Sequence, residues 1–233
     1  VFLLAATYAA AADENTLTVA VFPGAAPVSF LDENGRAKGA FPELLERLLA
    51  DCGYTAQLVV TSSFQEAFEM TASGRIDLLP GLLKTSEREK LFDFSRSPIM
   101  VSWGQVYSRP GEAVDTILDL KNQRIGLMTG DQNGQNFTKL MDSFDVTFVP
   151  VYFDDFALVV DAMLSGSVFA GVAFSTFYRT EQRVSPTDVI FSPSAAYIGA
   201  KKGTMGDVLG AVNARLEEVK ADDSSYYYGI LER

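Results

Sequence analysis

Residues 76–95 read Ile-Asp-Leu-Leu-Pro-Gly-Leu-Leu-Lys-Thr-Ser-Glu-Arg-Glu-Lys-Leu-Phe-Asp-Phe-Ser, an apolar segment followed by a charged one. Residues 76–79 form a short, mainly apolar run between Gly74 and Pro80, which predicts a buried strand. Just before them, Ser63 and Glu66 have the spacing of a capping box, so we expect a helix that runs through Ala72. The stretch therefore begins with the strand that completes a helix–turn–strand unit.

The residues before this unit predict a strand, a helix and a second strand. We expect the strands at residues 17–22 and 56–60, with a turn at residues 32–35. The helix between them has four leucines, with Pro42 near its first turn and Gly53 just past its end. Strands that alternate with helices of this length indicate an α/β fold with largely parallel sheets.

The same order of elements returns in the second half of the chain. A helix is expected after Thr129-Gly130-Asp131, and a second helix, opened by Asp154, ends at Ser165-Gly166. This Ser-Gly pair, followed by an apolar strand, repeats the Ser73-Gly74 pair of the first half. The repetition suggests two lobes of similar build. The strands expected in this half lie at residues 124–128, 146–149 and 168–173.

Two extended segments are expected to cross between the lobes. The first covers residues 99–107 and the second residues 195–200, and two such crossings would make a hinge. The last helices, near residues 206–220 and 224–233, would then pack on the first lobe. We therefore divide the chain into one lobe at residues 15–107 and 198–233 and a second lobe at residues 108–197.

Composition excludes several classes of function. The 233 residues carry a net charge of −11, which disfavours nucleic acid as a partner because phosphate contacts need a surplus of Lys and Arg. Histidine is absent, which removes the commonest general base and metal ligand, and we predict no catalytic residue, metal or cofactor. The single cysteine, Cys52, allows no intramolecular disulfide and is expected to be a buried thiol.

The first residues resemble a targeting segment. Residues 1–12 are apolar and end in small residues suited to cleavage, so residues 1–14 are interpreted as the remnant of a signal peptide. A fragment of a buried helix is the alternative interpretation. No later stretch is apolar for long enough to span a bilayer, so the mature domain is expected in the periplasm or elsewhere outside the cytoplasm.

Residues 76–95 resemble the signature of the family 3 solute-binding proteins, which have the type II periplasmic-binding-protein fold and serve polar amino acids. The resemblance covers residues 16–233 and implies a two-lobed α/β fold. In that fold each lobe is a mostly parallel sheet flanked by helices, a two-strand hinge joins the lobes, and the ligand lies in the cleft between them. Other landmarks occur in order: Pro27, Phe30, Gly35, Gly39-Ala40-Phe41, Leu118-Asp119-Leu120-Lys121, Tyr197-Ile198-Gly199, Lys201, Gly203 and Tyr226.

The resemblance also implies roles for particular residues. Arg88 matches the arginine that grips a ligand carboxylate, and a guanidinium offers a planar bidentate fork for that purpose. Gly81 matches the place where the backbone approaches the ligand, which suits a residue without a side chain. Phe64 matches an aromatic wall of the pocket. Thr129 lies at a helix start that favours anions in lobe two. Alternatively, Arg88 is a surface residue paired within its charged run, and Phe64 is a core residue.

Four positions depart from the pattern of amino-acid binders. An acidic residue that would pair with the ligand ammonium is replaced by Phe174-Ser175, an often polar position is Phe22, and Leu83 replaces a hydroxyl. Asp131 would either cap the helix start itself or face Arg88 across the cleft. We therefore expect simple α-amino acids to bind poorly. Carboxylates without an ammonium, or ligands with an apolar body, are expected to bind better.

The predicted function is extracytoplasmic binding of a small polar or carboxylate-bearing solute, with closure of the hinge. The partners would be an ABC permease or a fused membrane signalling module, because residues 79–107 also resemble sensor domains of histidine kinases and cyclic-nucleotide synthases. Two alternatives remain open. One is an enzyme resembling cyclohexadienyl dehydratases, with Asp131 or Glu66 as general acid. The other is a targeting domain of a larger envelope protein.

Overall fold

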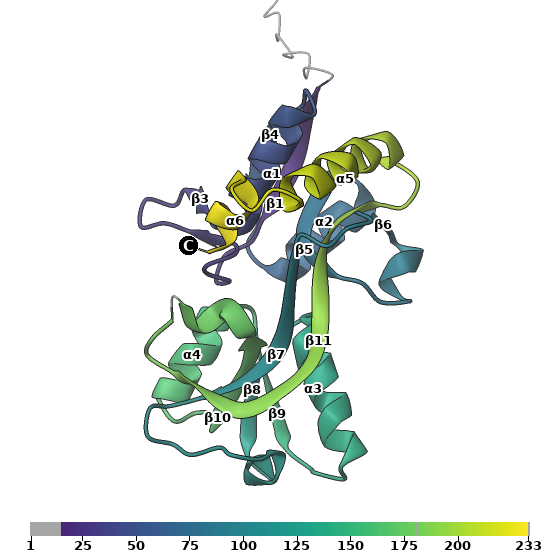
Figure 1. The fold of residues 1–233 in the computed structure, drawn as a ribbon. Helices are drawn as coiled ribbons and strands as arrows, with labels where there is room; N and C mark the ends of the chain where they lie inside the picture. Colours follow the sequence, from purple (N-terminus) through teal and green to yellow (C-terminus); the bar gives the residue numbers. More distant parts are fainter. Residues whose placement is uncertain (1–14, 180, 233) are drawn as a thin grey trace, which may run out of the picture.

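The computed structural model describes residues 15–179 and 181–232, which form two lobes joined by two long strands (Figure 1). The predicted α/β fold is confirmed. The described strands form one nine-stranded sheet in the order β4-β1-β5-β11-β7-β10-β8-β9, with β6 pairing on β11. A small ribbon of β2 and β3 stands apart from it. The predicted signal-peptide remnant at residues 1–14 lies outside the described residues.

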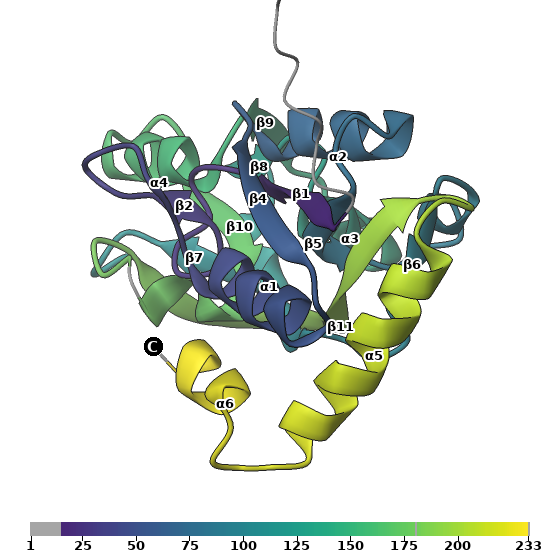
Figure 2. The ribbon, with the colours of Figure 1, turned by 90° about the horizontal axis from the view of Figure 1, so that it is seen from above.

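Lobe one combines the N-terminal elements with the two C-terminal helices. Strand β1 pairs in parallel with β4 and with β5, as the alternation of strands and helices predicts. The helices α5 and α6 pack against α1, as expected, and Figure 2 shows them along one side of the lobe. The elements are β1 (Thr16–Val21), β2 (Phe30–Leu31), β3 (Ala37–Lys38), α1 (Ala40–Asp51), β4 (Thr55–Val60), α2 (Phe64–Ser73), β5 (Leu78–Leu83), the 3-10 turn η1 (Arg88–Lys90), β6 (Phe92–Phe94), α5 (Gly206–Lys220) and α6 (Tyr226–Leu231).

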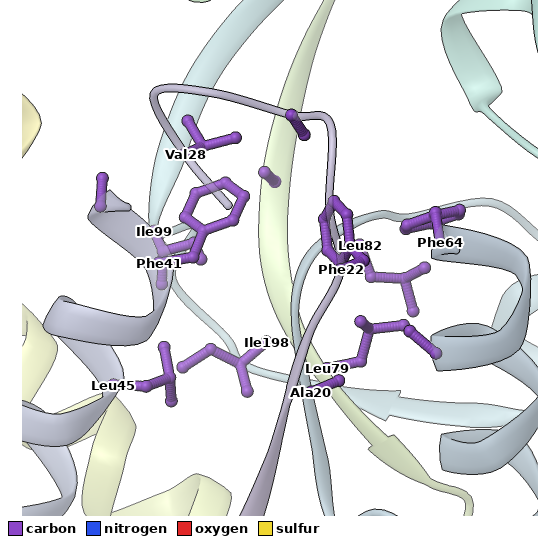
Figure 3. Close-up of a cluster of buried hydrophobic side chains, with 14 of the residues drawn as sticks. Ala20, Phe22, Val28, Phe41, Leu45, Phe64, Leu79, Leu82, Ile99 and Ile198 are labelled. Atoms are coloured by element: carbon purple, nitrogen blue, oxygen red, sulfur yellow. The ribbon is translucent and has the colours of Figure 1, made fainter. Parts of the chain in front are cut away.

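The core of lobe one forms between helices on the two faces of its strands (Figure 3). The leucines of α1 point inward with no exposed surface: Leu44, Leu45, Leu48 and Leu49. Burying each one contributes about 1.5–3 kcal/mol. Figure 3 shows Phe41 and Leu45 on one side of the strands, with Leu79 and Phe64 on the other. The spacing of apolar residues in α1 thus fixes where the helix lies.

Lobe two repeats the parallel arrangement on a smaller scale. Strand β8 pairs in parallel with β9 and β10, and its own apolar core includes Ile125, Leu127 and Phe137. Asp131 and Asp155 are the N-caps of its two α-helices. The elements are η2 (Ile117–Leu120), β8 (Arg124–Met128), α3 (Gln132–Ser143), β9 (Val149–Phe153), α4 (Phe156–Leu164), β10 (Ala170–Phe174) and η3 (Ser175–Arg179).

Two antiparallel strands join the lobes. Strand β7 (Met100–Ser108) lies within one residue of the first predicted crossing at residues 99–107. Strand β11 (Ser185–Lys201) is far longer than the expected segment at residues 195–200. β11 pairs with β5 and β6 in lobe one and with β7 along the crossing. Its pairing shifts register at three places, and these irregularities let one strand span both lobes. The lobe boundaries at residues 107/108 and 197/198 stay a prediction.

Several predicted element boundaries are wrong. The strand expected at residues 76–79 is β5, which begins at Leu78 because the chain first completes a turn after Gly74. It continues through Pro80 because the missing N–H falls where the pairing with β11 is irregular. The strand expected at residues 146–149 begins only at Val149, and the last helix of lobe two is capped by Asp155 instead of Asp154.

Two local predictions also change. The Ser63 hydroxyl accepts the hydrogen bond from the Glu66 N–H, as a capping box requires, but the Glu66 carboxylate accepts from the N–H and hydroxyl of Ser62. The reciprocal half of the box is therefore shifted by one residue. Cys52 is partly exposed, not buried, because it follows the last turn of α1. Burial is still sufficient to raise the pKa of its thiol, and the neighbouring Asp51 adds to this effect.

Candidate functional site

Two neighbouring cavities open between the lobes. The inner cavity has a volume of about 60 Å³ and draws its lining from both lobes, with Phe22 on one side and Asp131 on the other. The outer cavity measures about 820 Å³. Arg88, Leu83 and Ser194 line both cavities, so they lie where the two meet. The inner cavity collects seven of the nine predicted site residues: Phe22, Phe64, Gly81, Leu83, Arg88, Asp131 and Phe174.

Arg88 is a buried cation at the boundary of the two cavities. It follows β5 in the 3-10 turn η1, and only 7% of its surface is exposed. Its guanidinium donates hydrogen bonds to the carbonyl oxygens of Leu83 (3.0 Å) and Gly130 (3.2 Å), and the second bond crosses between the lobes. The ion pairs found among the described residues do not include Arg88. Carbonyls leave its positive charge uncompensated, which is the arrangement that an incoming anion requires.

Aromatic rings surround this guanidinium. Its central carbon lies 5.9 Å from the ring centre of Phe64 and 5.6 Å from that of Phe68, within the range of cation–π attraction. Burial lowers the pKa of Arg88, and the charge of Asp131 acts in the opposite direction. An arginine remains charged in either case. The surface-residue interpretation of Arg88 is therefore inconsistent with its position.

The inner cavity is mainly apolar. Phe22 meets Phe64 edge-on with ring centres 5.2 Å apart, and Figure 3 shows both beside Leu82. On the opposite side, Phe174 packs edge-on against Phe156, with ring centres 5.4 Å apart. The sequence analysis did not identify Phe41, Met100, Met128 or Phe156 as lining residues, and their apolar character alone could not separate them from core residues. These surfaces suit the apolar body of a ligand.

Gly81 lies inside β5 with a φ of +87°, a backbone conformation that favours glycine. A Cβ atom at this position would overlap the ring of Phe41, which lines the inner cavity. The glycine therefore leaves room for the Phe41 ring beside β5. Gly81 also lines the inner cavity, and the approach of its backbone to a ligand stays a prediction.

The start of α3 presents polar groups to the inner cavity. The Asp131 carboxylate caps the helix by accepting hydrogen bonds from the Asn133 N–H (3.1 Å) and side-chain amide (3.3 Å). It therefore adopts the first of the two predicted arrangements, without a direct ion pair to Arg88. Burial raises the pKa of Asp131, while its hydrogen bonds and Arg88 pull in the opposite direction.

Asn133 is a polar lining residue that the sequence analysis missed. It is 5% exposed, and its side-chain oxygen is buried without a hydrogen-bond partner among the described residues. Leaving such an acceptor unpaired costs about 1–3 kcal/mol. Its position two residues after the helix-capping Asp131 was the signal that could have identified it.

Thr129 and Ser175, the other two predicted site residues, do not line the inner cavity. The Thr129 N–H donates to the Phe153 carbonyl at 2.8 Å, which continues the pairing of β8 with β9. The Ser175 hydroxyl lies 3.0 Å from that of Ser102, and Ser102 does line the cavity. Ser175 therefore supports the site through a neighbour. Ser102 and Ser194 are further lining hydroxyls that the sequence analysis did not identify.

The outer cavity is polar. One face of α3 contributes Gln132, Gln135, Asn136 and Lys139. Lobe one contributes Gln65, Lys84, Thr85 and Glu87, and the strand β11 contributes Tyr197. The inner cavity, at about 60 Å³, is far smaller than the roughly 300–1,000 Å³ of a typical small-molecule site. A larger ligand held by Arg88 must therefore extend into the outer cavity or widen the inner one. The polar face of α3 lies along the first of these routes.

Among the described residues, no group of acidic or cysteine side chains could hold a metal ion. The two candidate general acids lie in different surroundings. Glu66 lines neither of these two cavities, and its hydrogen bonds from Ser62 lower its pKa, which opposes a role as general acid. Asp131 is the remaining candidate acid of the two predicted.

In the part of the chain that the structure describes, no helix could cross a membrane.

Comparison with known proteins identifies the family of this chain. The model of the bacterial extracellular solute-binding proteins, family 3, matches residues 17–227. The amino-acid-binding protein AabA of Dichelobacter nodosus is 22% identical over 190 residues, which cover 78% of this chain and 74% of that protein.

Solved structures share the architecture. An ancestral arginine-binding protein bound to glutamine superposes with a TM-score of 0.81 and 25% identity, covering 95% of this chain and 98% of the other. A histidine kinase sensor domain with similarity to periplasmic binding proteins has a TM-score of 0.79 at 18% identity, and the match covers 93% of this chain and 94% of the domain. At 18% identity the second comparison shows the fold alone. The same fold thus occurs both in an arginine-binding protein and in a histidine kinase sensor domain.

Proposed function

Because this chain belongs to the family 3 bacterial extracellular solute-binding proteins, we propose that it captures a small carboxylate-bearing solute between its lobes. Arg88 is the residue that anchors the carboxylate. The observation that carries this proposal is a buried guanidinium that is bonded to two carbonyl oxygens instead of a carboxylate. A ligand carboxylate can form two parallel hydrogen bonds with it in surroundings where charge is poorly screened.

The proposed role is binding without chemistry. Relatives that are named as amino-acid-binding proteins support it, and Glu66 is unsuited to act as a general acid. We place the protein outside the cytoplasm, exported by the predicted signal peptide. An ABC permease or a fused membrane signalling module would receive the bound state. The acidic net charge of −11 favours neither nucleic acid nor an anionic membrane surface.

The test is a ligand screen followed by substitution of the anchor. A thermal-shift screen of small carboxylates and amino acids identifies a binder, and calorimetry then measures its affinity for Arg88→Ala and Arg88→Lys. We expect Arg88→Ala to lose about 2–5 kcal/mol of binding free energy, because it removes one partner of a buried charge pair. Arg88→Lys also weakens binding, since a point charge cannot replace the fork.

Arg75→Ala is the matched control. Arg75 is an exposed arginine just past the end of α2 in the same lobe, and its guanidinium contacts Ser73. Its replacement leaves affinity unchanged if the effect is specific to the cleft. Unchanged affinity in Arg88→Ala, with melting behaviour showing a folded protein, would remove Arg88 from the site and overturn the proposal.

A further inference from the structure

An unpaired acceptor at the start of α3 indicates what a ligand presents to lobe two. The Asn133 side-chain amide donates to the Asp131 carboxylate at 3.3 Å, and its carbonyl oxygen is buried without a partner among the described residues. Turning the amide around would place that oxygen against the carboxylate, and two acceptors repel each other. The amide orientation is therefore set by Asp131, and Asn133 offers a hydrogen-bond acceptor, not a donor.

The Asp131 carboxylate offers further acceptor capacity in the same cavity. Its two oxygens accept from the N–H and the side-chain amide of Asn133, and a carboxylate has about four acceptor positions in all. It makes no ion pair within the described part of the chain, because Arg88 donates to carbonyl oxygens instead. Among the described residues that line the inner cavity, Arg88 is the single cation and Asp131 the single anion.

Helix polarity alone would favour an anion at this end of α3. The N-terminus of a helix carries roughly half a positive elementary charge. The full negative charge of an ionised Asp131 exceeds it, and the capping bond to the Asn133 N–H already occupies one of the free donors. The start of α3 therefore attracts a cationic or donor group.

The end of β10, which lines the same cavity, cannot serve an ammonium. The residue at the end of β10 is Phe174, which is 8% exposed and packs edge-on against Phe156 and Phe177. Ser175 turns its hydroxyl towards Ser102. Among the described lining residues, the charged acceptor for an ammonium is therefore the Asp131 carboxylate at the start of α3, and the hydroxyls of Ser102 and Ser194 are neutral.

We propose that the ligand is a zwitterion whose ammonium group donates hydrogen bonds to the Asp131 carboxylate and the Asn133 side-chain oxygen while its carboxylate lies at Arg88. This assignment rests on the proposed function, because it takes Arg88 as the carboxylate anchor. Each lobe then holds one end of the ligand. The sequence-based prediction that α-amino acids bind poorly considered the end of β10, and this proposal predicts the opposite result.

The experiment compares amino acids with their deaminated acids. The probes are the twenty protein L-amino acids, with 4-methylpentanoate, 3-phenylpropanoate and glutaramate as the deaminated partners of leucine, phenylalanine and glutamine. Where an amino acid outside these three binds, its own deaminated acid is added. Calorimetry should show at least one amino acid bound about 10–100-fold more tightly than its deaminated acid, because a charge-assisted hydrogen bond is lost with the ammonium.

Substitution at α3 should remove that difference. Asp131→Asn keeps a side chain that caps helices well, so the fold is retained while the charge is lost. It should weaken the amino acid about 10–100-fold and leave the deaminated acid unchanged or tighter. Asn133→Ala should weaken the amino acid by a smaller factor. Asp142→Asn, at an exposed acid near the other end of α3, is the control and should change neither affinity.

Each contrary result has a distinct meaning. Deaminated acids that bind as tightly as amino acids, with Arg88→Ala still harmful, overturn the zwitterion and retain the carboxylate site. Binding of a simple carboxylate with no binding of any amino acid likewise overturns the zwitterion. Amino-acid binding that survives Asp131→Asn and Asn133→Ala overturns the assignment to α3. Binding that is insensitive to Arg88→Ala overturns the proposed function itself.

Discussion

Replacing Gly81 with alanine tests whether the backbone of β5 sets the form of the cavity. An alanine at a φ of +87° costs about 1–2 kcal/mol in backbone strain. The added Cβ overlaps the ring of Phe41, and overpacking of this kind costs typically about 1–3 kcal/mol. The reduced freedom of the unfolded chain offsets about 0.4–1 kcal/mol. We therefore expect Gly81→Ala to lower the free energy of unfolding by about 1–5 kcal/mol.

The measurement is urea denaturation followed by circular dichroism, with a thermal melt in parallel. In a domain of this size, 1 kcal/mol moves the Tm by about 2–4 °C. Ligand affinity should fall as well, because Phe41 is displaced towards the space that the ligand needs.

Gly210→Ala makes the same chemical change elsewhere in the chain. Gly210 lies inside α5, where a Cβ would meet no atom within 4 Å, so alanine should stabilise the protein by about 0.5–1 kcal/mol. Equal effects of the two substitutions, or a Gly81→Ala protein as stable as the parent, would refute the reasoning.

Two further predictions concern charge and motion. Burial raises the pKa of Asp131 above its ordinary value of 3.8. Between the pKa of the unfolded chain and the higher pKa of the folded protein, the carboxyl group holds its proton only in the folded state. The free energy of unfolding therefore falls as pH rises through that interval. Ligand-free Asp131→Asn should therefore melt above the parent at pH 7, and the gap should close below about pH 4; a gap that does not change with pH contradicts this. Ligand should also favour a closed form, since both lobes then contact it, and small-angle scattering should show a smaller radius of gyration at saturation. An unchanged radius with verified binding would indicate a preformed pocket.

Local patterns predicted the elements of this fold well, and they failed where pairing between distant segments decided the outcome. The leucine spacing of α1 and the N-cap of α2 are visible in the sequence because both depend on neighbours along the chain. The length of β11 is not visible in the same way, because its residues 185–194 extend along β7 with shifts in register. The start of β9 was also misplaced, since its pairing with β8 determines it.

The family motifs identified several of the residues that line the inner cavity. Arg88, Gly81 and Phe64 lie at the inner cavity, as the resemblance implied, but their roles in binding stay predictions. The sequence could not show that Asn133 has an unpaired oxygen, because that depends on the orientation of one amide. Nor could it show that Arg88 reaches the Gly130 carbonyl, since that contact forms only when the lobes come together.

The passage of the chain through the two lobes has a consequence for the order in which they fold. Between β7 and β11 the chain builds β8, α3, β9, α4 and β10 from one uninterrupted segment, and their contacts are local. In contrast, α1 packs against α5 and α6 at the far end of the chain, and β5 pairs with β11. Closing such long loops slows folding, so we expect the amides of β8 and β10 to gain protection in pulsed hydrogen exchange before those of β1. The lobe that is synthesised first would then be completed last, and until α5 and α6 arrive the apolar face of α1 would be available to a chaperone.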